Sequence, residues 1–175
     1  RSAARPGHRR IHAALVMEDR TVCNMSREDY IAALEVKRLG LHHLHESLRG
    51  RPLRWLCAFS SVNSFAANAG QANYVAGCAV KDALALSLDG QAGFPVRVVN
   101  WGYWGDIGRV ATDEYRQRMA RLGVHSIGVE EGLDALEKIL AGTEPQVLAI
   151  RAEPAVLAQL GYEAGAEAEV EADVE

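Results

Sequence analysis

Apolar and polar positions follow one another in blocks whose lengths match strands and helices. Three short apolar runs predict strands buried on both faces, at residues 10–17, 53–62 and 96–104. Between them, Ser26 stands three residues before Asp29 at the start of a helical pattern that closes near Gly50. An alanine-rich apolar pattern predicts a second helix over residues 71–88.

The rest of the chain continues this alternation. Residues 112–123 and 129–142 predict two more helices, and residues 145–152 predict a further strand. Strands alternating with helices indicate an α/β, Rossmann-like fold, with a parallel sheet and helices on both faces. Ligands bind such sheets outside the carboxyl ends of the strands. The candidate site therefore consists of the segments that follow strand ends, residues 17–24, 60–70 and 101–110.

Composition narrows the functional classes. The chain has 175 residues, 49% hydrophobic and 24% charged, which is typical of one soluble domain. The segment 163–175 holds six acids and no base, so the net charge of −4 leaves +2 for the rest, which argues against a nucleic-acid binder. No signal or membrane-spanning segment is found, and the three cysteines form no CxxC pair. We expect a cytoplasmic protein without disulfides, and no metal site.

The predicted organisation has three parts. Residues 1–9 are expected to be a linker or the remnant of an upstream segment, and residues 10–160 the C-terminal part of a catalytic domain. Residues 161–175 are expected to be a disordered acidic linker. No GxGxxG turn, which would bring the backbone close to a pyrophosphate, is present, so the nucleotide-binding half of such a fold is expected to be missing from this chain.

Three residues combine into one possible chemistry. Ser61 follows a strand, Tyr74 lies in the first turn of the next helix and Lys37 lies on the preceding helix. A tyrosine with a pKa of about 10 needs a nearby cation to act as an acid or base at neutral pH. Lys37 could supply that charge, and Ser61 could hold a carbonyl oxygen while Tyr74 protonates it. Tyr74 alone would be interpreted as a packing aromatic residue.

These residues stand in segments that resemble a known family. The segments are IHAALVMEDRTVCNMSREDYIAALEVKRLG, FSSVNSFAANAGQANYVAGC and VNWGYWGDIG. Together they resemble the ketoreductase domains of modular polyketide synthases, in the short-chain dehydrogenase/reductase superfamily. The spacings from Lys37 to Ser61 and from Ser61 to Tyr74 agree with that family's catalytic lysine, serine and tyrosine. The resemblance covers residues 10–152.

The resemblance implies an activity and its participants. NADPH would supply hydride to the β-keto group of an acyl chain carried on the phosphopantetheine arm of an acyl carrier protein, and the upstream parts of the same domain would be partners. The cofactor would be bordered by His12, Ala13, Ala14, Trp101, Gly102 and Tyr103. The substrate would be bordered by Asp19, Val62 and Asn63.

The chain departs from the family pattern at several positions. Cys78 stands four residues after Tyr74, where the family has asparagine, and a thiol cannot replace both ends of a carboxamide. Lys81 lies about 10 Å along the helix from Tyr74 and is expected at the surface. Asp19 is retained from a Leu-Asp-Asp motif, and Ala66 replaces the tryptophan of the opposite class. We therefore expect the D-configured 3-hydroxyacyl product.

Two other functions stay open at this stage. Cys78 is consistent with a domain that retains the fold and the carrier contacts but has lost its chemistry. A free-standing dehydrogenase for small alcohols is the third possibility, and the acidic tail disfavours it because that tail is typical of an interdomain linker.

Overall fold

The computed structural model describes residues 7–66, 68–107 and 111–162. These residues divide into two compact units. The first unit comprises the described residues up to Trp101 together with Leu133–Ala149, and the second comprises residues 102–132 and those from Ile150 on. The predicted acidic linker lies outside the described residues, except for 161 and 162. Of the predicted N-terminal linker, His8 and Arg9 belong to the first strand.

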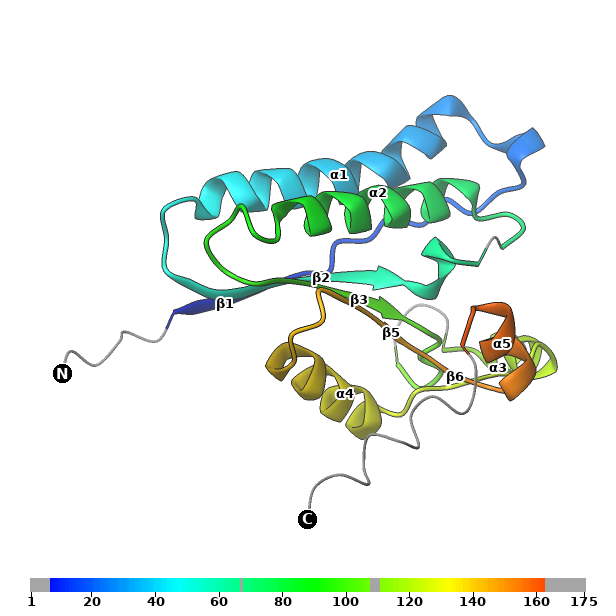
Figure 1. Cartoon of the computed structure of the whole chain (residues 1–175). Helices are drawn as coiled ribbons and strands as arrows, with labels where there is room; N and C mark the ends of the chain where they lie inside the picture. The colour runs from blue at the N-terminus through cyan, green and yellow to red at the C-terminus, as the bar shows by residue number, and fades with distance from the viewer. Residues whose placement is uncertain (1–6, 67, 108–110, 163–175) are drawn as a thin grey trace, which may run out of the picture. The chain divides into compact units, whose positions relative to one another are not determined.

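The first unit is built on a four-stranded parallel sheet, in agreement with the predicted α/β fold. Its strands lie in the order β1-β2-β3-β5, and every neighbouring pair is parallel. Figure 1 shows this sheet beneath two long helices. The strands are β1 (His8–His12), β2 (Leu53–Ser61), β3 (Val96–Trp101) and β5 (Gln146–Ala149).

Helices cover both faces of the sheet. The helices α1 (Arg27–Leu48) and α2 (Ala72–Leu88) lie side by side on one face. The part of α4 (Val129–Ala141) that belongs to this unit lies on the opposite face and leads into β5 (Figure 1). The Ser26 hydroxyl accepts a hydrogen bond of 3.0 Å from the Asp29 amide, so the predicted N-cap of α1 is confirmed.

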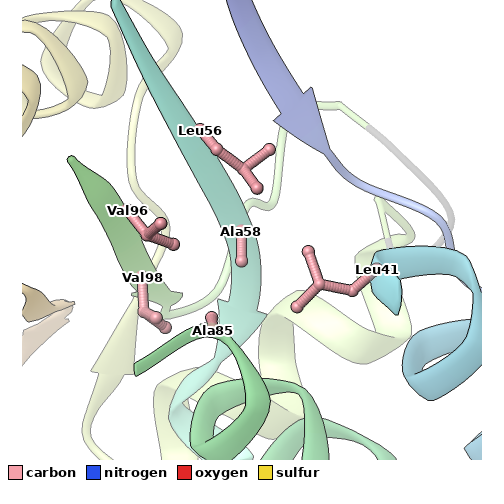
Figure 2. Packing of buried hydrophobic residues seen from close by; sticks show 6 residues of the cluster. All are labelled: Leu41, Leu56, Ala58, Ala85, Val96 and Val98. Carbon is pink, nitrogen blue, oxygen red and sulfur yellow. The ribbon is translucent and has the colours of Figure 1, made fainter. Parts of the chain in front are cut away.

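The core of the first unit lies between the two long helices and the sheet. Figure 2 shows that side chains of α1 and α2 point toward those of β2 and β3, and that small alanines stand on both β2 and α2. Small side chains at both positions let α2 approach the sheet closely. The cluster consists of Leu41, Leu56, Ala58, Ala85, Val96 and Val98, each at most 1% exposed.

The second unit is smaller. Its strands β4 (Val124–His125) and β6 (Arg151–Ala152) pair antiparallel, and its helices are α3 (Asp113–Arg121) and the short α5 (Pro154–Gln159). The hydroxyl of Thr112 accepts a hydrogen bond from the Tyr115 amide and caps α3. Neither α5 nor the β4–β6 pair is predicted from the sequence, because both are too short to show a periodic pattern.

Three predicted strand boundaries are wrong. The strand β1 ends at His12 and not near Met17, because its last paired residue faces Ala58 and the chain then leaves the sheet. The strand β3 ends at Trp101. The predicted strand 145–152 is two strands, since β3 provides no partner beyond Ala149, and β6 pairs with β4 instead. Among the described residues, no helix has the length and apolar character needed to cross a membrane.

Candidate active site

Ser61 stands where β2 ends and a 3-10 turn, η2 (Val62–Ser64), begins. Its hydroxyl accepts a hydrogen bond of 3.2 Å from the Asn63 amide and so caps that turn. Ser61 is 9% exposed, and Val62 beside it is half-buried. The turn therefore fixes the direction of the Ser61 side chain at the carboxyl end of the sheet.

Tyr74 and Lys37 meet between the two long helices. Tyr74 lies in the first turn of α2 and is half-buried, whereas Lys37 of α1 is 2% exposed. The Lys37 ammonium nitrogen lies 4.3 Å from the centroid of the Tyr74 ring, within the range of a cation–π interaction. The structure thus brings together the lysine and the tyrosine that the sequence analysis selected.

A glycine makes this approach possible. A Cβ atom at Gly77 of α2 would lie 2.8 Å from Lys37 Cδ and 3.0 Å from the Ala33 carbonyl oxygen of α1. Carbon atoms in contact normally lie about 3.5–4.0 Å apart, so any larger side chain would force the two helices or the lysine to move. Gly77 therefore allows the Lys37 side chain to pass between the helices.

Some neighbours of the Tyr74 hydroxyl raise its pKa, and one lowers it. Burial raises the pKa of Tyr74 above its ordinary value, and the neighbouring Cys78 raises it further, whereas a hydrogen bond with Ser61 lowers it. The sequence analysis expects Lys37 to lower this pKa. In the structure the Lys37 ammonium lies over the ring face, and burial determines the direction of the shift.

Cys78 occupies the position next to the phenol. It is fully buried, and its side chain shares a hydrogen bond with Tyr74 that favours the protonated phenol. A thiol is a weak donor and acceptor. The expected asparagine position is thus filled by a group that contacts Tyr74 but offers little hydrogen-bonding capacity to anything else.

The loop after β1 is tied to the start of α2. The Gln71 amide donates a hydrogen bond of 2.7 Å to the Asp19 carboxylate, and the Asn73 amide donates one of 2.8 Å to the Glu18 carbonyl. The Asn73 side-chain oxygen also accepts from the Tyr74 backbone amide, and Asn73 is fully buried. Asp19 is thereby placed close to the catalytic candidates.

The same network extends into η2. Asn63, which is 9% exposed, donates to the Gln71 side-chain oxygen at 2.8 Å and accepts from the Asn68 amide at 2.8 Å. Asn63 therefore joins the two loops of the site and is more than the loop former that its residue type suggests. Gln71 and Asn73 were missed in the sequence analysis, although both lie in the quoted segment GQANY next to Tyr74.

His12, Ala13 and Ala14 lie where β1 ends. His12 is 6% exposed, and neither of its ring nitrogens has a hydrogen-bond partner among the described residues. Burial, followed by the charges of Lys81 and Lys37, lowers the pKa of His12 to about 4. A Cβ atom at Gly40 would lie 2.6 Å from His12 Nε2, so α1 packs directly on the imidazole. Ala13 and Ala14 are exposed.

The remaining cofactor candidates follow one another in the chain, and Trp101 belongs to the first unit. Trp101, 7% exposed, ends β3 and packs edge-on against Phe59, with ring centroids 5.6 Å apart. Gly102 and Tyr103 belong to the second unit. Within that unit, the Tyr103 ring packs on Tyr115 at 5.3 Å, and its carbonyl accepts from the Ile127 amide.

Two buried polar groups flank the end of β2. Lys81 is 1% exposed and donates a hydrogen bond to the Phe59 carbonyl, so the expected surface position of Lys81 is wrong. On β3, the fully buried Asn100 amide donates to the Ser61 carbonyl at 3.1 Å and to the Asp82 carboxylate at 2.7 Å. Gln146 of β5 in turn donates to the Asn100 side-chain oxygen. Neither group has a sequence motif that distinguishes it from surface residues.

The described residues contain no group of three or more histidine, cysteine, aspartate or glutamate side chains placed to hold a metal ion. His42 is exposed on α1, and His45 lies 3.5 Å from the carboxylate of the adjacent Glu46. His45 and Glu46 are sequence neighbours on α1, and their side chains are 16% and 42% exposed.

Comparisons with known proteins agree on one family. The model of the KR domain family matches residues 7–106, more than half of the chain. Among curated proteins, the chain is 41% identical to the polyketide synthase PksN of Bacillus subtilis over 81% of its length, and 42% identical to the polyketide synthase ThaG of Burkholderia thailandensis over 77%. It spans only 3% and 2% of the lengths of these two proteins.

Solved structures give the same result. The chain superimposes on a ketoreductase domain from the bacillaene assembly line with a TM-score of 0.79 and 28% identity. That superposition covers 86% of this chain and 38% of the other. An A-type ketoreductase from a modular polyketide synthase gives a TM-score of 0.76 and 28% identity, over 83% of this chain and 30% of the other.

Proposed function

Because the chain belongs to the KR domain family, the ketoreductase domains of modular polyketide synthases in the short-chain dehydrogenase/reductase superfamily, we propose that it carries the proton-donating half of such an enzyme. The proposed reaction reduces the β-keto group of an acyl chain on an acyl carrier protein to a 3-hydroxyacyl thioester. One observation carries this proposal. Lys37, Ser61 and Tyr74, from three different elements, gather at the carboxyl end of the sheet.

The residues of the chain divide the work at the carbonyl. The Ser61 hydroxyl, fixed by its cap on η2, holds the substrate oxygen, and the Tyr74 phenol donates its proton to that oxygen as negative charge develops. The raised pKa of Tyr74 keeps the phenol protonated before the reaction, as a proton donor requires. Lys37 stabilises the phenolate that remains and helps to return the proton.

The residues present fit only one end of the proposed cofactor. NADPH, when bound, supplies the hydride to the carbonyl carbon. Exposed Ala13 and Ala14 follow the carboxyl end of β1, so this edge can border the nicotinamide and its ribose, while the buried His12 imidazole packs against α1. The Gly-rich turn for the pyrophosphate is expected in upstream parts of the same domain, which act as partners of this chain.

The test compares two variants in a complete ketoreductase domain that joins this chain to those upstream parts. Oxidation of NADPH is followed with a β-ketoacyl thioester mimic. Tyr74→Phe removes only the phenol oxygen, so turnover should fall by at least about 100-fold, the scale of general-acid catalysis, while NADPH binding changes little. Tyr30→Phe makes the same change on the exposed surface of α1 and is the matched control. Turnover that survives Tyr74→Phe would contradict the assigned proton donor.

One observation favours a second candidate function. Cys78 fills the expected asparagine position with a buried thiol, which is consistent with a structural domain that has lost its reductase activity. Cys78→Asn in the same complete domain separates the two functions. We expect measurable turnover before the substitution and a several-fold increase after it. A domain that is inactive with Cys78 and active with asparagine would support the structural role.

Three finer properties belong to the same proposal. The acyl carrier protein would present its phosphopantetheine arm near the loop that holds Asp19, which Gln71 ties to the site. The retained Asp19 favours the D-configured 3-hydroxyacyl product, and chiral chromatography of that product tests the assignment. We expect the protein to work in the cytoplasm, as part of such an assembly line.

A further inference from the structure

Lys81 of α2 is a buried lysine that has no role in the proposed proton transfer. Its side chain is 1% exposed, and its ammonium donates a hydrogen bond to the Phe59 carbonyl of β2. Lysine is almost never fully buried unless it is paired, because desolvation of the charge is costly. A role that depends on the ammonium group is therefore expected.

The register of the sheet explains why a donor is needed there. The last residue of β1, His12, faces Ala58, so β1 offers no partner to the end of β2, Phe59–Ser61. A buried carbonyl without a donor costs about 1–3 kcal/mol. Lys81 supplies that donor from α2, and a bond from a charged donor is stronger than one from a neutral group.

The carbonyl that Lys81 holds lies two residues before Ser61. On the other side of the strand, β3 pairs with residues Phe59–Ser61, and the Asn100 amide donates to the Ser61 carbonyl at 3.1 Å. The end of β2 is thus fixed by β3 and Asn100 on one flank and by Lys81 from the helix layer. Without Lys81, one of these attachments to the backbone that carries the Ser61 hydroxyl is lost.

The charged and titratable groups around Lys81 come from each element packed on it. These are His12 of β1, Lys37 of α1, Cys57 of β2, and Cys78 and Asp82 of α2, while Arg97 of β3 acts on Cys57. Burial and then the charge of Lys37 lower the pKa of Lys81 to about 8, and Cys78 and Asp82 oppose this shift. Lys81 consequently loses its charge within the pH range of an enzyme assay.

From this geometry we propose that Lys81 is a positioning residue, whose ammonium holds the carboxyl end of β2 and thereby places the Ser61 hydroxyl for the reaction. Its effect on turnover rests on the proposed function, whereas its effect on the end of β2 does not. Lys81 touches neither substrate nor cofactor in this role and acts through the backbone of Phe59 and Ser61.

The experiment uses Lys81→Met and Lys81→Arg in the complete domain. Lys81→Met keeps the length of the side chain but removes donor and charge, and Lys81→Arg keeps both at every assay pH. Lys138→Met, which removes an exposed lysine of α4, is the matched control. Hydrogen exchange of the amides of residues 61–65 is measured alongside NADPH oxidation as a function of pH.

Lys81→Met should accelerate exchange at residues 61–65 and lower kcat by about 10- to 100-fold, as expected when a catalytic group is displaced by up to about 1 Å. The wild-type kcat should fall as pH rises through about 8, the pKa of Lys81, and this step should be absent from Lys81→Arg. Exchange and kcat in Lys81→Met that match Lys138→Met would overturn the inference. If Lys81→Met does not fold, a pH profile of Lys81→Arg identical to the wild type overturns it.

The two proposals fail in different ways. A wild-type domain that consumes no NADPH, but whose residues 61–65 exchange faster in Lys81→Met, contradicts the proposed function and supports the positioning role. An active wild-type domain whose exchange and pH profile do not change in either Lys81 variant contradicts the positioning role alone.

Discussion

The substitution Gly77→Ala tests the packing that brings Lys37 to Tyr74. The added Cβ would lie 2.8 Å from Lys37 Cδ and 3.0 Å from the Ala33 carbonyl oxygen, against an ordinary carbon contact of about 3.5–4.0 Å. The lysine or the helix must therefore move by about 1 Å. Overpacking of this kind costs about 1–3 kcal/mol, and the better helix propensity of alanine returns at most about 1 kcal/mol.

We expect Gly77→Ala to lower the free energy of unfolding by about 1–2 kcal/mol in urea denaturation followed by circular dichroism. A displacement of about 1 Å at a catalytic group can cost about 100-fold in rate. The kcat for the β-ketoacyl thioester mimic should therefore fall even under conditions where all of the Gly77→Ala protein is folded. The control is Gly128→Ala, whose Cβ would meet nothing closer than a Glu131 carboxylate oxygen at 4.0 Å.

A double-mutant cycle identifies the atoms responsible. In a Lys37→Ala background the Cδ and Cε atoms that face Gly77 are gone, so the cost of Gly77→Ala in stability should shrink to the part caused by the Ala33 carbonyl. An unchanged cost in that background, or a stabilised Gly77→Ala protein, would refute the view that Lys37 crosses between α1 and α2 at this glycine.

Two further predictions concern buried polar groups. Asn73→Ala should lower the free energy of unfolding by about 1–3 kcal/mol, because the partly buried Glu18 carbonyl and Tyr74 amide lose their partner, and urea denaturation measures this cost. The folded-state pKa of His12, about 4, lies below the ordinary value of about 6.5, so protons bind preferentially to the unfolded chain between these values. Stability should therefore fall as pH falls from about 6.5 to about 4, and this component should be missing in His12→Asn; equal pH dependence in both proteins would contradict it.

The sequence predicts the fold class well because long periodic segments dominate it. The two long helices, the strand β2 and the cap at Ser26 follow from apolar periodicity and local turn chemistry. The end of β1 does not, because the strand itself, HRRIH, is mostly polar, whereas the apolar residues 13–17 that the pattern assigns to it lie beyond its end. What ends β1 is tertiary, since the Asn73 amide draws the Glu18 carbonyl toward the start of α2.

The sequence likewise predicts some residues of the candidate site and misses others. Lys37, Ser61 and Tyr74 lie on predicted helices and at a predicted strand end, and they are selected because their spacings agree with those of the ketoreductase family. The burial of Lys81 is not predicted. Its place in the helical pattern, one turn beyond Cys78, does not show whether the side chain faces solvent or the sheet. Its partner, the Phe59 carbonyl, is left without a β1 neighbour because β1 stops at His12, and the sequence analysis placed that end wrongly.

Cys78 stands where the family has asparagine, and the contacts that position Ser61, Tyr74 and Lys37 show what this difference changes. Asn100 holds the Ser61 carbonyl, and the cap on η2 holds the Ser61 hydroxyl. Asn73 holds the backbone amide of Tyr74, and Gly77 leaves room for the Lys37 side chain. None of these attachments passes through residue 78. Loss of the usual carboxamide therefore removes hydrogen-bonding capacity beside the phenol and leaves the arrangement of the other groups in place. For this reason Cys78→Asn changes the chemistry of the site without rebuilding its architecture, and any rate it gains measures the contribution of that amide.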